Sequence, residues 1–171
     1  MNRIYINNNY NNNNIFKILF CGNSFVGKTC LIKRLHTNNF HEKLSQTIGI
    51  DFTSISYNID NKNCLLRLLD TTGQNKYSDL ILQQARDVDG VVFVYDISDM
   101  NSFQEIENWQ KKIQTVSKEN IQFTLIGNKC DLQDRQVPKS KGLEYAESNS
   151  MNFFETSAKD GKDISKTGGL K

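Results

Sequence analysis

The sequence has no long apolar run, little net charge and no closely spaced cysteine pair. No apolar stretch approaches the ~18 residues of a membrane-spanning helix, and the polar N-terminus lacks the features of a secretory signal. A net charge of +2 over 171 residues does not indicate nucleic acid as a partner. Without C-x-x-C spacing, the four cysteines favour buried free thiols over disulfides or a metal site. We therefore expect a cytoplasmic protein.

The first 14 residues are poor in side chains that a core could bury. Eight of them are asparagine, so ordering this segment would cost more conformational entropy than burial could offset. We predict a disordered tail over residues 1–14 and one domain over residues 15–171, which is long enough to bury a core.

The most informative stretch is a glycine-containing motif between a predicted strand at 16–21 and a helical apolar pattern at 30–36. The motif is G-x-x-x-x-G-K-T, whose backbone N–H groups can surround phosphate. Lys28 supplies a cation, and the Thr29 hydroxyl is a hard ligand for Mg²⁺. The alternative is a glycine-rich turn that binds nothing, which eight matched positions disfavour. The predicted phosphate-loop residues are Gly22, Asn23, Ser24, Phe25, Val26, Gly27, Lys28, Thr29 and Cys30.

Strands and helices alternate along the rest of the chain. Apolar patterns predict further strands over residues 50–59, 64–69, 90–96, 122–127 and 151–155. Further helices are predicted over residues 78–86, 102–117 and 137–148. Ser102 and Glu105 form a capping box for the second of these helices, whose apolar stripe is Phe103, Ile106, Trp109 and Ile113. The alternation predicts an α/β fold: a mostly parallel six-stranded sheet with helices on both faces and ligands at the C-terminal strand ends.

Four polar segments follow predicted strands, where this rule places a ligand. Thr47 and Asp70 can join Thr29 in an Mg²⁺ site, Asp70 acting through a bound water. The segment 128–131, Asn-Lys-Cys-Asp, suits recognition of a base. The Asp131 carboxylate can accept from the ring N–H and the exocyclic amine of guanine, a donor pair that adenine lacks. A backbone N–H of the Ser-Ala-Lys segment 157–159 can meet the guanine carbonyl.

In this order the motifs make the sequence resemble the Ras superfamily of small GTPases and, within it, the Rab family. The resemblance covers about residues 15–163, and beside the phosphate loop it is carried by the segments 47–52, 95–98, 128–131 and 155–159. It implies a P-loop NTPase domain that is active with GTP and silent with GDP, hydrolyses GTP with Mg²⁺, and serves vesicle traffic. The implied partners are effectors, exchange factors and GTPase-activating proteins.

The resemblance also implies roles for individual residues. Thr47 and Gly73 would hold two loops against the γ-phosphate, and Gln74 would orient the attacking water as the catalytic residue. Phe40 matches an aromatic that packs on guanine, although a phenylalanine there equally suits the core. The implied nucleotide set beyond the phosphate loop is Phe40, Thr47, Asp70, Thr71, Thr72, Gly73, Gln74, Asn128, Lys129, Asp131, Ser157, Ala158 and Lys159. The implied effector surface is Leu44, Ser45, Gln46, Thr47, Ile48, Gly49, Ile50, Asp51 and Phe52.

Some residues depart from the family pattern. Phe25 stands where relatives carry a small residue, so its ring must point away from the phosphates or crowd the γ-position. Thr72 replaces the usual alanine, and its β-branched side chain resists the movement that brings Gly73 to the γ-phosphate. We therefore expect slow hydrolysis. An altered choice of effector or exchange factor is expected from the unusual residues Leu44, Leu69 and Asn75.

Two alternatives stay open at this point. A nucleotide-binding interaction protein that does not cycle would accommodate Phe25 and Thr72, whereas an intact Gln74 favours the enzyme. An ATP-using P-loop kinase is opposed by the base motif at 128–131.

The C-terminal end differs from the family pattern as well. Only thirteen residues follow Ala158, and no cysteine lies beyond Cys130. We expect the last helix to be missing or degenerate, with about residues 164–171 irregular, and no prenylation signal. The resulting expectation is a cytoplasmic protein without a stable membrane anchor, at most transiently associated with endomembranes.

Overall fold

The computed structural model describes residues 15–40, 46–59 and 62–164 as one α/β fold. Its strands are β1 (Ile15–Cys21), β2 (Ile50–Ile59), β3 (Lys62–Thr71), β4 (Gly90–Asp96), β5 (Gln122–Asn128) and β6 (Asn152–Glu155). Its helices are α1 (Lys28–Thr37), α2 (Ser78–Ala85), α3 (Met100–Gln114) and α4 (Lys139–Ser148), with a 3₁₀ turn at Asn75–Tyr77. Every predicted strand and helix is confirmed; the strands at 50–59 and 90–96 have the predicted ends, and the ends of the other elements are shifted. The predictions for the tail 1–14 and for Leu44 and Ser45 lie outside the described residues.

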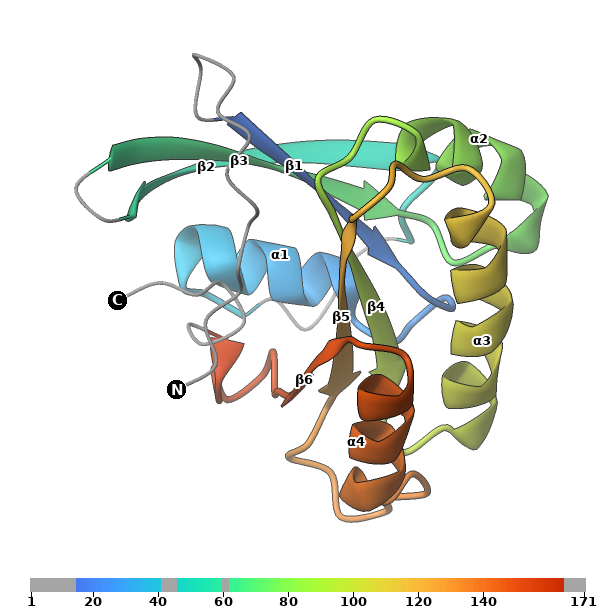
Figure 1. The fold of residues 1–171 in the computed structure, drawn as a ribbon. Helices are drawn as coiled ribbons and strands as arrows, with labels where there is room; N and C mark the ends of the chain where they lie inside the picture. The colour runs from blue at the N-terminus through green and yellow to red at the C-terminus, as the bar shows by residue number, and fades with distance from the viewer. Residues whose placement is uncertain (1–14, 41–45, 60–61, 165–171) are drawn as a thin grey trace.

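The sheet brings the C-terminal ends of its parallel strands to one edge. Its order is β2-β3-β1-β4-β5-β6. Strand β1 pairs in parallel with both β3 and β4, and β5 pairs in parallel with β4 and β6. Strand β2 runs antiparallel to β3. The predicted mostly parallel sheet of six strands is confirmed, and the loops that follow the parallel strands meet at one edge (Figure 1).

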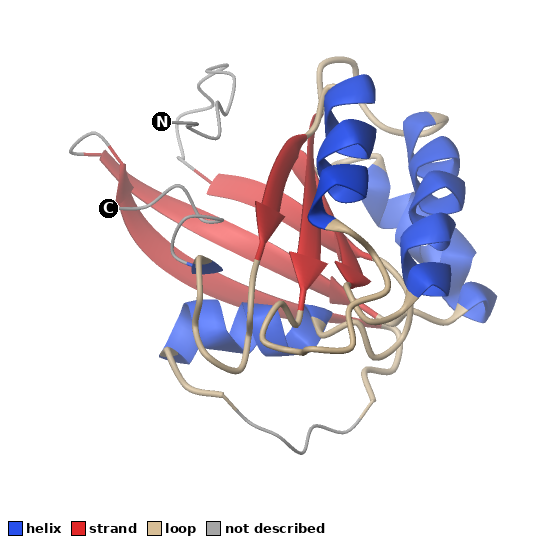
Figure 2. Ribbon diagram, turned by 90° about the horizontal axis from the view of Figure 1, so that it is seen from below, coloured by secondary structure: helices blue, strands red, loops and turns tan. Residues whose placement is uncertain are grey.

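Helices cover both faces of the sheet, as predicted (Figure 2). Helix α1 packs on one face, where Leu31 and Leu68 belong to the same core. Helices α2, α3 and α4 pack on the other face, where Ile81, Trp109 and Ala146 share a second core. The predicted apolar stripe of α3, Trp109 included, is buried in that core. The sheet is thus packed on both faces. The loops at the C-terminal ends of its strands start from this packed sheet, which fixes their positions.

The start of α3 corrects one prediction. The helix begins at Met100, and its N-cap is Asp99, whose side chain accepts a hydrogen bond from the Asn101 N–H at 3.0 Å. Ser102 is fully buried instead. Its hydroxyl donates to the Asp99 carbonyl at 2.7 Å and accepts from the Asp96 N–H at 3.0 Å. The predicted capping box was therefore wrong, because Ser102 binds the end of β4, a contact that local sequence does not reveal.

The last described residue, Ile164, packs into the core on the α1 face of the sheet. Ile164 is helical in conformation, is 4% exposed and belongs to the core that contains α1. The prediction that the last helix is missing and that about residues 164–171 are irregular does not hold for Ile164, which is helical in conformation. Residues 165–171 lie outside the described part. Within the described residues, no helix has the length and apolar character needed to cross a membrane.

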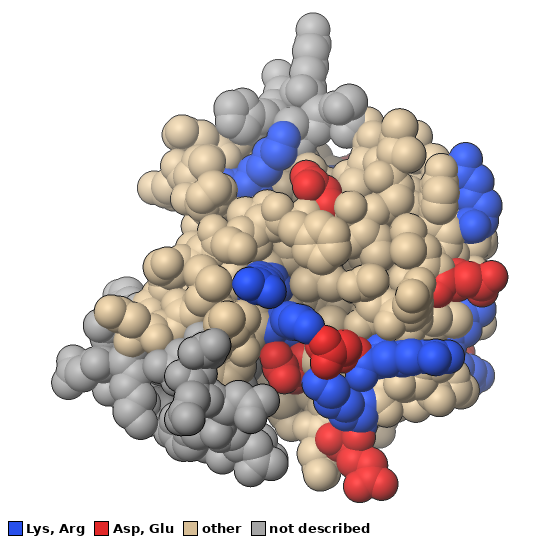
Figure 3. Space-filling model, turned by 90° about the horizontal axis from the view of Figure 1, so that it is seen from above, with Lys and Arg blue, Asp and Glu red and all other residues tan. Residues whose placement is uncertain are grey.

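The opposite edge of the sheet carries charged pairs at its surface. The Lys17 ammonium pairs with Asp87, which also lies 3.2 Å from the Lys118 ammonium. Hydrogen bonds from both lysines hold the pKa of the exposed Asp87 carboxyl below its usual range. Acidic and basic side chains are interspersed on the face seen from above (Figure 3), so this face shows no broad field of one sign.

The packing of Gly142 in α4 generates a test of the fold. A Cβ at this position would lie 2.5 Å from the hydroxyl oxygen of Tyr95 and 2.8 Å from ring carbons of Phe153. Alanine is favoured over glycine within helices by about 1 kcal/mol, but overpacking costs about 1–3 kcal/mol. We expect Gly142→Ala to lower the free energy of unfolding in urea by about 1 kcal/mol. The exposed Glu144→Ala control should change it by less than about 0.5 kcal/mol, and stabilisation by Gly142→Ala would contradict the tight packing.

Candidate functional site

The loops at the C-terminal edge of the sheet enclose a cavity of about 430 Å³. Its walls are Ser24, Phe25, Gly27, Lys28, Thr29, Cys30, Phe40, Gln46, Thr47, Thr71, Thr72, Gly73, Asn128, Lys129, Asp131, Leu132, Ala158 and Lys159. The structure thus brings most of the predicted nucleotide residues to one cavity. The predicted residues that do not line it are Gly22, Asn23, Val26, Asp70, Gln74 and Ser157. The nucleotide prediction did not include Leu132, an apolar residue that only its position after Asp131 could have indicated, or Gln46.

The phosphate loop, residues 22–29, needs its two glycines for different steric reasons. Gly22 has φ 142°, and a Cβ there would lie 2.1 Å from the Val94 carbonyl oxygen. Gly27 has φ 97°, and a Cβ there would lie 2.3 Å from the amide nitrogen of Asn128. Any larger residue would push the loop away from β4 or break the Asn128 contact. The loop ends at α1, whose N-cap Gly27 offers no side-chain hydrogen bond, so the first N–H groups of the helix remain available to an anion.

Lys28 is a buried cation held by the phosphate loop itself. The residue is 5% exposed, and its ammonium donates to the carbonyls of Gly22 at 2.8 Å and Asn23 at 2.7 Å. Burial lowers the pKa of Lys28 from 10.5 to about 8, with the Cys21 thiol and Asp70 acting in the opposite direction. A bound anion would stabilise the charged form of this buried ammonium, because the two carbonyls compensate its positive charge only partly.

Three oxygen-bearing side chains converge beside Lys28. The Thr29 hydroxyl donates to Asp70 Oδ2 at 2.6 Å, and the hydroxyl oxygens of Thr29 and Thr47 lie 2.9 Å apart. Thr47 lies 3.4 Å from the same carboxylate oxygen. Asp70 is 3% exposed, and burial raises its pKa, while the hydrogen bond from Thr29 acts in the opposite direction. The predicted cluster of Thr29, Thr47 and Asp70 is therefore present in the structure.

This oxygen cluster fits a hard cation. The second carboxylate oxygen of Asp70, Oδ1, is buried and has no hydrogen-bond partner among the described residues, which is costly unless a ligand supplies charge. Magnesium is commonly held by one or two carboxylates together with phosphate oxygens and water. The described residues contain no group of three His, Cys, Asp or Glu side chains that could hold a metal alone. The donor set thus suits Mg²⁺ only together with phosphate ligands.

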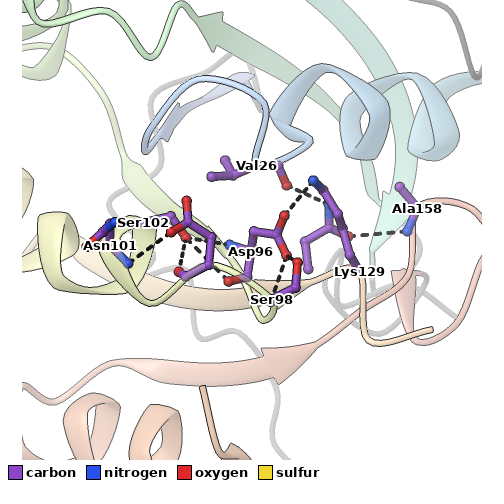
Figure 4. Close-up of polar contacts among 9 residues, drawn as sticks. Val26, Asp96, Ser98, Asn101, Ser102, Lys129 and Ala158 are labelled. Carbon is purple, nitrogen blue, oxygen red and sulfur yellow. Dashed lines mark hydrogen bonds and ion pairs between the residues drawn. The ribbon is translucent and has the colours of Figure 1, made fainter. Parts of the chain in front are cut away.

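The other end of the cavity is organised by Asn128. Its side-chain amide donates to the Val26 carbonyl in the phosphate loop at 2.8 Å. Its carbonyl oxygen accepts from the Ala158 N–H and from the Thr156 hydroxyl, both at 3.3 Å. The contacts to Val26 and Ala158 are drawn in Figure 4. One side chain, 1% exposed, therefore connects the phosphate loop with both predicted base segments.

The segment that follows β3 closes against the phosphate loop. A Cβ on Gly73 would lie 1.9 Å from the Ser24 backbone nitrogen, so the two backbones are in direct contact. The Thr72 N–H donates to the Gly49 carbonyl at 2.9 Å. Thr72 is 2% exposed, and within the described part of the chain its hydroxyl has no hydrogen-bond partner. Gln74 is partly buried beside this segment but does not line the cavity.

The two phenylalanines at the cavity differ in environment. Phe25 is 78% exposed and adopts φ 66°, a left-handed conformation that costs a residue with a β-carbon about 1–2 kcal/mol. Of the two placements expected for its ring, the structure has the one directed to solvent. Phe40 packs against the α1 core and also lines the cavity. Both placements considered for Phe40, in the core and at the base site, are therefore compatible with the structure.

The predicted effector surface is partly described. Ile48 is 82% exposed and Phe52 is 62% exposed, values that are unusual for large apolar side chains. Leu44 and Ser45 from the same predicted surface lie outside the described residues. The described part of this surface adjoins the cavity through Gln46 and Thr47, which line it.

Lys28 generates a pH prediction for the ligand-free protein. The pKa of this side chain is 10.5 in the unfolded chain and about 8 in the folded chain. Between these two pH values the unfolded chain binds more protons, so the free energy of unfolding rises with pH. We expect the free energy of unfolding of the wild type, relative to Lys28→Met, to rise between pH 8 and 10.5 by up to about 1.4 kcal/mol for each pH unit. Urea titrations of both proteins at several pH values measure this difference, and a flat or falling difference would contradict the lowered pKa.

Comparison with known proteins agrees with this geometry. Residues 17–167 match the model of the Ras family. The Ras-related protein Rab-13 of Canis lupus familiaris is 38% identical over 151 residues, which are 88% of this chain and 74% of the relative. Rab-10 of Diplobatis ommata is 38% identical over 153 residues, 89% of this chain and 76% of the relative. RABE1e of Arabidopsis thaliana is 37% identical over 152 residues, 88% of this chain and 70% of the relative.

The matched region includes the phosphate loop, the oxygen cluster and both base segments. Proteins of this family bind GTP and GDP with Mg²⁺, hydrolyse GTP, and work with regulators and effectors. The chain belongs to the Ras family, as a Rab-type small GTPase that switches between GTP and GDP in vesicle trafficking.

Proposed function

We propose that the cavity holds one guanine nucleotide, with its phosphates at the Lys28 end and its base at the Asp131 end. The observation that carries this proposal is that a buried lysine, both threonines of the oxygen cluster and residues of the base segments line one cavity. The Asn128 contacts to Val26 and Ala158 support a fixed spacing between the two ends. A single ligand with an anionic tail and a polar base fits that spacing.

At the phosphate end, Lys28 exchanges its two carbonyl partners for phosphate oxygens. The N–H groups of residues 22–29 and the start of α1 surround the anion. Thr29, Thr47 and Asp70 would hold Mg²⁺, which supplies positive charge beside the β- and γ-phosphates. The unpartnered Asp70 Oδ1 supports this assignment, because a bound cation or its water would satisfy that atom.

At the base end, Asp131 accepts hydrogen bonds from the ring N–H and the exocyclic amine of guanine. Adenine cannot present that donor pair, so ATP would leave the carboxylate unsatisfied. The N–H groups of residues 157–159 face the guanine carbonyl, and Phe40 and Lys129 flank the ring plane. This arrangement is supported by the position of Asp131, Lys129, Ala158 and Phe40 in the cavity wall.

In hydrolysis, Gln74 orients the attacking water while Lys28 stabilises the charge that develops on the γ-phosphate. Gln74 lies directly after Gly73, whose backbone already contacts the phosphate loop. A small shift of this segment would bring its side chain to the cavity. Thr47 and Gly73 would follow the γ-phosphate and leave it on hydrolysis, which exposes or withdraws the described part of the effector surface, residues 46–52.

We further propose that this chain hydrolyses GTP slowly. We call closed the arrangement in which Thr47 lies against Thr29 and Gly73 contacts the phosphate loop, as both do in the structure. The buried Thr72 hydroxyl without a partner destabilises that closed arrangement. The strained backbone at Phe25 adds a cost within the phosphate loop itself.

Its macromolecular partners are proposed to be proteins that contact the exposed apolar residues of 46–52, with action at endomembranes, where Rab relatives work. The near-neutral charge supports protein partners over nucleic acid. The exposed Ile48 and Phe52 side chains provide the apolar area that such contacts need.

The identity of the bound nucleotide tests the proposal directly. Chromatography of nucleotide released from the purified, acid-denatured protein should show GDP or GTP. Excess ATP should fail to displace it. Asp131→Ala should weaken GDP binding at least about hundredfold, since two hydrogen bonds to a charged acceptor are lost. The exposed Asp134→Ala in the same loop is the matched control and should bind GDP like the wild type. Retention of ATP, or no retained nucleotide, would contradict the assignment.

Single-turnover hydrolysis of loaded GTP tests the slow rate. We expect Thr72→Ala and Phe25→Gly each to raise the rate about three- to tenfold, because each removes a cost of about 1 kcal/mol from the closed arrangement. Gln74→Leu should lower the rate. This decrease would confirm that the assay measures GTP hydrolysis by the protein itself. Unchanged rates in both gain variants would contradict the role assigned to these residues. A wild type that binds GTP without any turnover would favour the interaction protein that does not cycle.

A further inference from the structure

We propose that Asp96 is a positioning residue for guanine recognition, which it controls by holding Lys129 in place. This inference rests on the proposed function, since it concerns the base end of the same cavity. Asp96 ends β4 and does not line the cavity, whereas Lys129 does. The two side chains meet in an ion pair, with the Lys129 ammonium 2.5 Å from Asp96 Oδ2 (Figure 4).

The Asp96 carboxylate is fixed on both of its oxygens. Oδ1 accepts from the Ser98 N–H at 2.9 Å and from the Ser98 hydroxyl at 2.7 Å, while Oδ2 meets Lys129. The Asp96 side chain is only 10% exposed. Its backbone N–H donates to the buried Ser102 hydroxyl at 3.0 Å, which connects it to the first turn of α3. The carboxylate therefore has one orientation available, and that orientation faces Lys129.

Lys129 needs such a partner because its backbone is strained. It adopts φ 63°, a left-handed conformation that residues with a β-carbon adopt at a cost. The conformation makes a tight turn, in which the Leu132 N–H donates to the Lys129 carbonyl at 3.0 Å. This turn directs Asp131 into the cavity wall. The ion pair to Asp96 stabilises the only residue of the turn that carries this strain.

The backbone hydrogen bonds on either side of Lys129 do not involve its own side chain. The Ile97 N–H donates to the Asn128 carbonyl, and the Cys130 N–H donates to the Thr156 carbonyl, both through the backbone. Those bonds fix the two residues beside Lys129 but not its own dihedral angles. Loss of the Asp96 charge therefore allows Lys129 to relax toward an ordinary conformation, which moves Asp131 away from the exocyclic amine of guanine.

The test compares dissociation of two fluorescent nucleotides from the full chain, GDP and inosine diphosphate, which lacks the exocyclic amine. Asp96→Asn should speed GDP release about tenfold or more, the effect of losing a hydrogen bond to a charged group. Release of inosine diphosphate should accelerate less, so the preference for GDP shrinks. A purely structural role would accelerate both nucleotides equally, and that result would overturn the inference.

Variants at Lys129 examine the same contact from its other end. Lys129→Met should speed GDP release at least as much as Asp96→Asn, because it also removes the side chain that flanks the base. The double variant should add little to Lys129→Met. Lys129→Arg keeps a cation for Asp96 and should therefore release GDP more slowly than Lys129→Met. Equal release from Lys129→Arg and Lys129→Met, or fully multiplied effects in the double variant, would overturn the inference. This comparison stands even where Asp96→Asn folds poorly.

Asp99→Asn is the matched control, because asparagine still caps α3 and the side chain does not meet Lys129. It should leave both release rates within about twofold of the wild type, and a larger effect would overturn the specific role of Asp96. A wild type that does not retain GDP, or does not prefer it to inosine diphosphate, would overturn the proposed function together with this inference. Normal GDP retention with an unaffected Asp96→Asn would overturn the inference alone.

Discussion

The whole site depends on one buried amide, the Asn128 side chain at the end of β5. It donates to the phosphate loop through the Val26 carbonyl and accepts from the Ala158 N–H after β6. Gly27 can approach this amide only because it has no side chain. The three loops belong to distant parts of the chain, and without a common partner their spacing would vary with each loop. Buried hydrogen bonds of this kind are costly to break, so they hold both ends of the cavity at a fixed separation.

Around this fixed frame lie polar groups that the protein alone does not satisfy. Among the residues that the structure describes, the Lys28 ammonium donates only to backbone carbonyls, and neither Asp70 Oδ1 nor the buried Thr72 hydroxyl has a hydrogen-bond partner. Buried polar atoms in such a state destabilise the ligand-free protein. For Lys28 and Asp70 the proposed nucleotide and Mg²⁺ would remove this cost, and binding energy and stability are then linked. Thr72 differs, since neither proposed ligand is assigned to it.

Much of the fold could be predicted from local pattern. The presence of the strands and helices could be predicted from runs such as residues 90–95, which carry no charged side chain because β4 is buried on both faces. Capping was less predictable. Ser102 has the sequence environment of an N-cap, yet it contacts Asp96 across the β4–α3 connection, and Asp99 caps the helix instead. A local motif competes with tertiary contacts that have no signature in neighbouring residues, and here the tertiary contact prevailed.

The sequence by itself determined the chemistry of the site: which residues carry charge, hydroxyl or carboxylate, and in which order along the chain, because the strand–loop–helix pattern places them after strands. It also identified Phe25 and Thr72 as unusual residues. Only the tertiary structure decided that the Phe25 ring faces solvent on a strained backbone and that the Thr72 hydroxyl is unpartnered. It alone showed the ion pair between Asp96, the last residue of β4, and Lys129, which directly follows β5. Orientation, burial and pairing depend on neighbours distant in sequence, and composition and spacing carry no information about them.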